Sequence, residues 1–423
     1  MKNSELHSFS VKEQTKDIKS KLEPNKILIY DAIMGSGKTT SAIERMRLYS
    51  TIGQKFIFVT PFLEEINRVQ DKLDSIIETP VSKHEFDILN VYSSGTKKYS
   101  YKNKRDSYID LLSQNKNIAT THSLFGSLSV GDASLFKDYI LIIDEAINPI
   151  TLFEFGARDI EILFNEQLIS KDVRTNKINV TDRQYKDNSF KEVLNFCRQD
   201  NVYLNNNTFI SHFPIEIMNA CKQVEILTYL FDSSLMAYYF KLKGCNYSFL
   251  TKLDEKSIKV KIKNNLNIYE GSRNQNKRSK TAFSKNNLTK KSKQERKKIK
   301  DKISYVFRYE FRTGSNHSAF TTFKEIKSKY AGKGYTKGFI PINARATNEF
   351  SHKKSMAYIG NRYLNPAILS FFKEKGIKIN QDYWALSELI QWIWRGCIRN
   401  DEKMNLYIPS NRMRNLLISW LND

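Results

Sequence analysis

A glycine-rich segment follows a short apolar run near the N-terminus and limits what the chain can fold into. Residues 27–30 read Ile-Leu-Ile-Tyr, and residues 31–40 read Asp-Ala-Ile-Met-Gly-Ser-Gly-Lys-Thr-Thr before an amphipathic stretch. Glycines let backbone N–H groups turn toward a phosphate, and a following helix adds the positive end of its dipole. The segment therefore predicts a strand–loop–helix unit that binds nucleotide phosphates.

The residues of this loop have the chemistry that binding of ATP and Mg²⁺ requires. Lys38 supplies a positive charge for the β- and γ-phosphate oxygens, and the Thr39 hydroxyl can hold Mg²⁺. Ala32 occupies the place of the first glycine of the pattern. The expected nucleotide-binding residues are Ala32, Met34, Gly35, Ser36, Gly37, Lys38, Thr39 and Thr40. ATP and Mg²⁺ are therefore the expected cofactors.

Two adjacent carboxylates, Asp144 and Glu145, end the apolar run at 139–143. Such a pair by itself also fits a helix N-terminus. Downstream of a phosphate-binding loop it predicts the second half of an ATPase site, with Asp144 in the Mg²⁺ shell and Glu145 orienting and deprotonating the attacking water.

Short apolar runs alternate with amphipathic stretches from residue 26 to about 240. The runs lie at 27–30, 56–60, 118–121, 139–143 and 226–230, and helices are expected at 39–49 and 63–77. Uninterrupted Ile- and Val-rich runs are typical of strands buried on both faces, so a parallel sheet flanked by helices is predicted. Further strands are expected at 319–323, 339–342 and 406–408. The predicted organisation is an extension at 1–25 and α/β domains at 26–240 and 241–423.

Three segments depart from this rhythm. Residues 152–220 are richer in polar residues and predict an inserted, partly helical segment. Residues 273–302 hold 13 Lys and Arg and a net charge of +11, which predicts either a mobile basic loop or a charged helix near 294–302. The alternation at 303–312 predicts a half-buried strand whose aromatic side chains face the core rather than stack on bases.

The charge balance points to a polyanionic partner. Lys and Arg number 68 against 45 Asp and Glu, a formal net charge of +23, which makes nucleic acid the first candidate. Four widely spaced cysteines predict neither a disulfide framework nor a zinc site. The chain has no apolar run long enough for a bilayer span and no secretory h-region, so no membrane association and a cytoplasmic location are expected.

The ATPase residues and their surroundings resemble the first motor domain of a superfamily 2 (DEAD/DEAH-like) helicase. In that family two RecA-like P-loop domains close on ATP and grip one nucleic-acid strand. Thr60-Pro61 and Thr121-His122 occupy the places of motifs Ia and Ib, which the resemblance implies contact the phosphodiester backbone. Residues 228–233 lie where motif III would couple hydrolysis to movement.

The C-terminal half supplies the remaining motifs of the resemblance. Gln391, Arg395 and Arg399 fall in a segment like motif VI, which implies Gln391 near the γ-phosphate and one of the two arginines as the finger. The alternative is a helix with both arginines on a solvated face. Motifs IV and V imply nucleic-acid contacts at Thr322, Arg345, Thr347 and Asn348.

The expected function is that of an ATP-dependent helicase or single-strand translocase in phage-like replication or recombination. Single-stranded DNA is the expected partner, with replisome proteins as further partners. Two alternatives stay open: a packaging-motor ATPase, and a replication initiator or loader that uses ATP only as a switch. Repeated ATP turnover per binding event distinguishes a motor from a switch.

Overall fold

The computed structural model describes residues 26–33, 35–82, 103–181, 190–197, 201–205, 207–251, 254–274, 279–342 and 349–423. The chain divides into two compact units. The first runs to residue 252 without the loop 32–36, and the second comprises this loop and residues 253–423. Met34, Arg345, Thr347 and Asn348, all expected site residues, lie outside the described residues.

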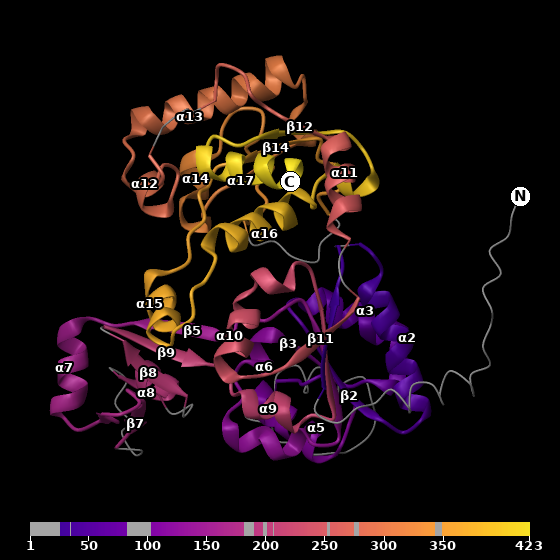
Figure 1. Ribbon diagram of the computed structural model, residues 1–423, viewed down its shortest axis with the longest axis vertical. Helices are drawn as coiled ribbons and strands as arrows, with labels where there is room; N and C mark the ends of the chain where they lie inside the picture. Colours follow the sequence, from indigo (N-terminus) through magenta and orange to yellow (C-terminus); the bar gives the residue numbers. More distant parts are fainter. Residues whose placement is uncertain are drawn as a thin grey trace, which may run out of the picture. The chain divides into compact units, whose positions relative to one another are not determined.

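The first unit is built on a 6-stranded, wholly parallel sheet with strand order β11-β1-β10-β4-β2-β3. Strands β2, β3 and β11 of this sheet are labelled in Figure 1. Its strands are β1 (Lys26–Asp31), β2 (Lys55–Thr60), β3 (Ile118–Thr121), β4 (Tyr139–Asp144), β10 (Gln223–Thr228) and β11 (Tyr247–Thr251). Phe56, Ile57 and Phe58 are wholly buried, as an uninterrupted apolar run predicts for a central strand. Each predicted strand of this region is present.

Helices flank this sheet. They are α2 (Lys38–Thr51), α3 (Leu63–Leu73), α5 (Lys104–Ser113), α6 (His122–Phe125), α9 (Ile215–Ala220) and α10 (Leu235–Lys243). Ala42, Met46 and Tyr49 of α2, spaced four and three residues apart, share one hydrophobic cluster with Ile66 and Val69 of α3. The same cluster contains side chains of β2, β3 and β4, so α2 and α3 cover one face of the sheet.

The insertion between β4 and β10 forms a small subdomain within the first unit. It contains an antiparallel sheet of order β5-β9-β8 and the hairpin β6–β7. Its elements are β5 (Ile150–Glu154), α7 (Ala157–Asn165), β6 (Ile169–Lys171), β7 (Ile178–Val180), α8 (Lys191–Cys197), β8 (Val202–Asn205) and β9 (Thr208–His212). A separate cluster of buried side chains, including Leu163, Val193 and Phe209, gives this segment its own core. The insertion is therefore partly helical, as predicted, and also contains strands that the sequence did not reveal.

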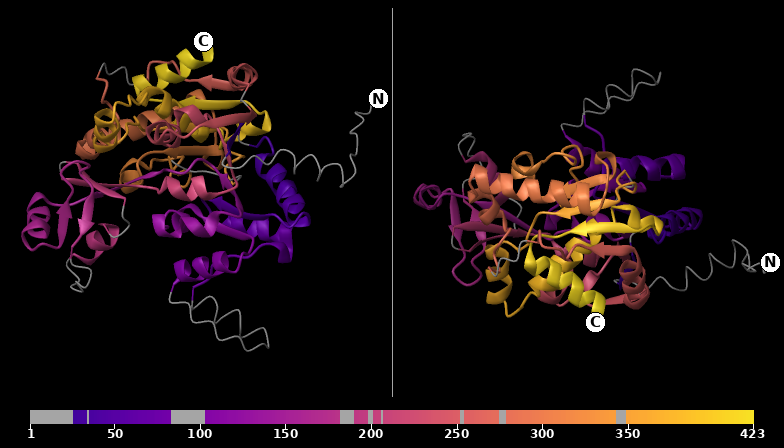
Figure 2. Two further views of the ribbon diagram at one scale, coloured as in Figure 1. Left: turned by 60° about the horizontal axis from the view of Figure 1, so that its bottom comes forward. Right: turned by 90° about the horizontal axis from the view of Figure 1, so that it is seen from above.

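The second unit has a 4-stranded parallel sheet of order β12-β15-β14-β13. This unit is drawn in pink, orange and yellow in Figure 2. Its strands are β12 (Leu266–Ile268), β13 (Ser318–Thr321), β14 (Ser355–Tyr358) and β15 (Met404–Tyr407). Its helices are α11 (Glu255–Asn265), α12 (Lys285–Lys290), α13 (Lys293–Tyr305), α14 (Lys327–Tyr330), α15 (Pro366–Glu374), α16 (Gln381–Ile393) and α17 (Asn411–Asn422). Two α/β units with parallel sheets are the fold class that the sequence predicted.

The strand predicted at 303–312 is wrong. Helix α13 runs through Tyr305 and continues as a π-helical turn over Val306–Glu310. Ser292 and Glu295 form a capping box that starts the helix, and Ile299, Ile303 and Val306 then recur at helical spacing and are buried. The upstream helix therefore extends through a segment whose local alternation is typical of a strand.

The strand expected at 339–342 is reduced to a single bridge between Phe339 and Phe320. Pro341 lies in this run and has no N–H group to donate to a ladder. The basic segment takes the second of its two predicted forms, because α13 is a charged helix that begins at Lys293. Within the described parts of the chain, no helix has both the length and the apolar character that crossing a bilayer requires.

Candidate nucleotide-hydrolysis site

The loop after β1 has the backbone of a phosphate cradle. Gly35 and Gly37 have φ angles of 82° and 85°, in the left-handed region that residues with a Cβ rarely adopt. Gly37 is the N-cap of α2, which has no side-chain cap and no acidic residue in its first turn. The first turn of α2 thus presents backbone N–H donors with no acidic side chain among its residues. This donor set fits the phosphates of a nucleotide.

The expected loop residues lie at the surface of this cradle. Gly35, Ser36, Gly37 and Thr40 are exposed, and Lys38 is half-buried at the first position of α2. A Cβ added to Gly37 would meet no atom within 4 Å, so this position requires glycine because of its φ angle and not because of crowding.

The acidic pair lies beside this helix. β4 ends at Asp144, and the Thr39 hydroxyl lies 3.3 Å from Asp144 Oδ1 as a hydrogen-bond donor. Glu145 follows with a φ of 68°, a rare value for a residue with a side chain, and its N–H donates to the Leu227 carbonyl at 2.8 Å. A hydroxyl and a carboxylate at this separation fit a shared Mg²⁺.

Burial dominates the protonation of Asp144. Together with the nearby carboxylates of Glu145 and Glu65 it raises the pKa of Asp144 to about 7, although Lys38 and Thr39 act to lower it. Without a cation the site therefore holds a carboxyl group that is protonated below neutral pH. A divalent cation or a correctly placed lysine would favour the ionised form.

This shift predicts a stability gain for Asp144→Asn. The unfolded carboxyl group loses its proton near its usual pKa of 3.8 and the folded group only near 7, so ionisation costs stability that grows between these values and is constant above them. We expect the variant to gain on the order of 4 kcal/mol at pH 8 in EDTA. Urea unfolding measures the gain.

The matched control is Asp138→Asn. Asp138 is exposed and lies just before the start of β4, so this variant should unfold with nearly the stability of the wild type. The gain at Asp144 should shrink at pH 5. An equal gain at both pH values, or a loss at pH 8, would contradict the burial argument.

Asp31 is a site residue that the sequence analysis missed. Its carboxylate accepts hydrogen bonds from the backbone N–H groups of Leu230 at 2.7 Å and Phe231 at 3.2 Å. Burial raises its pKa to about 6, partly offset by these two N–H groups and by Lys38. Asp31 thus joins the start of the phosphate loop to the segment 228–233, which was expected to couple hydrolysis to movement. The sequence feature that could have revealed Asp31 is its position as a polar residue at the end of a buried strand.

The residues expected to touch nucleic acid in the first unit lie at the ends of β2 and β3. The Nε2 atom of His122 lies 2.9 Å from the carbonyl oxygen of Asp144, so this histidine contacts the backbone of the acidic pair. The Thr121 hydroxyl accepts a hydrogen bond from the Leu124 N–H and caps α6. Thr60 is wholly buried, whereas Pro61 is half-buried.

The residues expected near the γ-phosphate from the second unit cluster at the end of α16. Gln391 is half-buried on α16, Arg395 is 2% exposed just beyond it, and Arg399 is half-buried in the short helix Cys397–Asn400. Burial lowers the pKa of Arg399. A Cβ on Gly396 would lie 2.4 Å from the Met404 sulfur and 2.5 Å from the Met356 sulfur, so a larger residue between the two arginines would require these side chains to move. Thr322, which follows β13, is wholly buried.

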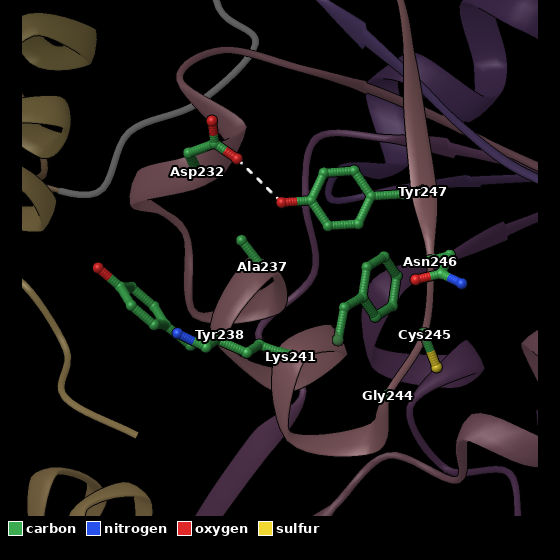
Figure 3. Close-up of a pocket in the computed structure, with 9 residues that line it drawn as sticks. Asp232, Ala237, Tyr238, Lys241, Gly244, Cys245, Asn246 and Tyr247 are labelled. Atoms are coloured by element: carbon green, nitrogen blue, oxygen red, sulfur yellow. Dashed lines mark hydrogen bonds between the residues drawn. The ribbon is translucent and has the colours of Figure 1, made fainter. Parts of the chain in front are cut away.

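A cavity of about 420 Å³ lies elsewhere in the first unit, between α10 and the start of β11 (Figure 3). Tyr238 and Lys241 come from α10, and Tyr247 donates a hydrogen bond of 3.0 Å to Asp232. Its lining includes neither the phosphate loop nor the acidic pair, so this cavity is not the nucleotide site.

Comparison with known proteins identifies the family. The SPβ prophage-derived protein YonV of Bacillus subtilis (strain 168) is 35% identical over 425 residues, a match that covers 94% of this chain and 99% of that protein. The chain belongs to the YonV family. A family model described as the YonV C-terminal Rossmann-like domain matches residues 260–421, which lie in the second unit.

The fold of this YonV-family chain is shared with a known helicase structure. A solved structure described as an XPD helicase aligns over 99% of both chains with a TM-score of 0.54 at 14% sequence identity. This match confirms the predicted fold class of two RecA-like units with parallel sheets. At this identity it establishes the fold alone.

Proposed function

We propose that the chain is an ATP-driven motor that binds single-stranded nucleic acid, DNA in the first place, and translocates along it. The observation that carries the proposal is the contact between Thr39 and Asp144. This contact supports the proposal because the two residues expected to bind Mg²⁺ are neighbours at the carboxyl ends of parallel strands, where α/β folds bind their ligands.

The residues of the first unit have distinct parts in hydrolysis. Lys38 and the N–H groups at the start of α2 hold the β- and γ-phosphate oxygens. Thr39 and Asp144 would hold Mg²⁺, which neutralises phosphate charge when bound. Glu145 takes a proton from water as that water attacks the γ-phosphorus, and the bond to the bridging oxygen breaks to release ADP. The buried position of Glu145, 8% exposed, limits its hydration.

Two contacts support coupling of hydrolysis to a bound strand. His122, at a position expected to meet the nucleic-acid backbone, touches the carbonyl of Asp144. Asp31 ties the phosphate loop to the backbone of Leu230 and Phe231. Displacement of either segment by a bound strand would therefore act directly on residues that handle ATP. The formal net charge of +23 supports a polyanionic track.

The proposed mechanism also uses an arginine, which we expect from the second unit. Guanidinium stays charged and presents a rigid fork of donors to charge that develops on the transferred phosphoryl group. We assign this part to Arg395 or Arg399, and Gln391 to the γ-phosphate. The relative in a prophage supports action on phage DNA, in replication or recombination.

Displacement of streptavidin from a biotinylated oligonucleotide tests the proposal. A motor that tracks along the strand should remove streptavidin from one end in a reaction that requires ATP hydrolysis, because translocation pushes against the block. A switch binds and releases the strand without displacing the block. Bound oligonucleotide with no displacement from either end, while ATP is hydrolysed, would contradict translocation.

The arginine assignment predicts that replacing one of the two arginines by alanine greatly lowers kcat for ATP hydrolysis. An arginine finger contributes about 10³-fold or more to phosphoryl transfer, so Arg395→Ala or Arg399→Ala should lower kcat by that order. Steady-state ATP hydrolysis with single-stranded DNA measures it. The matched control is Arg412→Ala, which removes a second-unit guanidinium bound to Asp382 and Asn361. Full activity in both single variants would contradict the assignment.

A further inference from the structure

The end of α13 presents two aromatic rings to solvent. The chain passes from α13 into the π-helical turn Val306–Glu310, and this turn divides the aromatic residues between two faces. Val306 and Phe307 are buried in the core of the second unit, whereas Tyr305 is 36% exposed and Tyr309 55% exposed. The two exposed rings lie side by side, with centroids 4.9 Å apart and planes 44° apart.

An arginine lies against each of these rings. The Cζ atom of Arg273 lies 4.2 Å from the centroid of Tyr305, and that of Arg308 lies 5.3 Å from the centroid of Tyr309. We call Arg273, Tyr305, Tyr309 and Arg308 the arginine–tyrosine ladder. The core already receives its apolar residues from the same turn, so packing does not account for two large exposed rings between guanidinium groups.

The helix that leads to the ladder is strongly basic. α13 carries six Lys and Arg against Glu295 and Asp301, and it lies along one edge of the second unit (Figure 1). Lys298 and Lys302 precede Tyr305 by seven and three residues, a spacing that puts them on its side of the helix. The ladder therefore continues from a row of positive charge about 10 Å long.

We propose that the arginine–tyrosine ladder and the lysines of α13 form a binding site for single-stranded nucleic acid. Exposed aromatic rings stack on unpaired bases, while neighbouring Lys and Arg contact the phosphates. The bases of a duplex are already stacked, so the ladder fits a single strand. The choice of this partner rests on the proposed function. The site itself lies wholly in the second unit, outside the motifs of the ATPase. It provides a second binding surface for the strand.

The test is binding of a fluorescent oligonucleotide to the full chain without nucleotide, measured by anisotropy at several salt concentrations. Tyr305→Ala with Tyr309→Ala should weaken binding about 10- to 100-fold, because base stacking is lost, with little change in the salt slope. The matched control, Tyr305→Phe with Tyr309→Phe, keeps both rings and should bind as the wild type does. Lys298→Ala with Lys302→Ala should lower the salt slope instead.

A second readout reports stacking directly. Oligonucleotides that contain 2-aminopurine should lose fluorescence on binding to the wild type and to the Phe variant, and keep more of it with the Ala variant. Equal affinity and equal quenching for the Ala variant and the wild type would overturn the proposal, as would equal affinity for a duplex.

ATP hydrolysis measured with and without single-stranded DNA separates this proposal from the proposed function. Tyrosine-dependent binding by a protein that hydrolyses no ATP would support the ladder and refute the motor. Strand-stimulated hydrolysis with unchanged binding in the Ala variant would refute the ladder and leave the motor. Absence of oligonucleotide binding by the wild type would refute both.

Discussion

Replacement of Lys38 by alanine is expected to lower the turnover of ATP by about 10²–10³-fold, the usual loss when one preorganised donor to a reacting phosphate is removed. Lys38 begins α2 directly after Gly37, at the open end of the helix, and it acts on the pKa of both Asp31 and Asp144. It is thus the positive charge shared by the phosphate cradle and the acidic pair. Steady-state phosphate release in saturating single-stranded DNA measures the loss.

The controls for Lys38 separate charge from geometry. Lys38→Arg keeps a positive charge but replaces a compact ammonium group by a planar guanidinium group. Its ATP hydrolysis should therefore also be impaired. Lys55→Ala removes a lysine where β2 begins, at the opposite end of the strands from the phosphate loop, and the variant should hydrolyse ATP at the wild-type rate. Normal turnover by Lys38→Ala would show that the loop is not the nucleotide site.

Loss of the buried carboxylate Glu225 is expected to cost about 3–5 kcal/mol of stability, because it leaves a largely buried cation without its partner. Glu225 lies on β10 and is 0% exposed. It accepts hydrogen bonds from Arg45 Nη2 at 2.7 Å, from the Tyr49 hydroxyl at 2.5 Å and from Gln223 Nε2 at 3.1 Å. Arg45 and Tyr49 are one turn apart on α2, so the network holds the helix of the phosphate loop to the sheet.

The side chains around Glu225 show how strongly this network is coupled. Burial, with Glu225 adding to it, raises the pKa of Tyr49 well above its usual range. Burial acts to lower the pKa of Arg45, but Glu225 together with Tyr30 and Tyr49 outweighs it, and the pKa is raised. The Arg45 guanidinium also lies over the ring of Tyr30, with Cζ 4.3 Å from the centroid. Glu225→Ala removes the one carboxylate of this group.

An exposed ion pair in the same unit is the matched control for Glu225. Lys116 Nζ and Glu78 Oε1 are 2.8 Å apart, but their side chains are 42% and 46% exposed. Glu78→Ala should therefore cost less than about 1 kcal/mol. Urea unfolding and hydrogen exchange of α2 and β10 measure both variants. Equal costs for Glu225→Ala and Glu78→Ala would contradict the network, and Glu225→Leu with Arg45→Met should recover much of the loss.

The sequence predicted those parts of the fold whose structure can be recognised from the residues of a single segment. β2 and β4 lie between other strands and are covered on both faces, so their residues form continuous apolar runs. The glycines of the phosphate loop likewise indicate positive φ angles, which are a local property of the backbone. Lys38, Thr39, Asp144 and Glu145 could be proposed for this reason.

Where the sequence analysis failed, distant segments decide the structure. The alternation at 303–312 fits a strand locally, but the capping box at Ser292 and the buried face of α13 extend a helix through it. Strand β8 (Val202–Asn205) is short and mostly half-buried, and its pairing with β9 is not visible in its own residues. The role of Asp31 depends on its hydrogen bonds with Leu230 and Phe231, which lie about two hundred residues away in the sequence.

The measurement that tests the central claim most directly is steady-state ATP hydrolysis by the wild-type chain with and without single-stranded DNA, single-stranded RNA and duplex DNA. The account predicts low turnover alone and strong stimulation by single strands, which weakens as salt rises because the contacts to phosphates are electrostatic. Turnover that is the same with and without every polymer would contradict a nucleic-acid-driven motor.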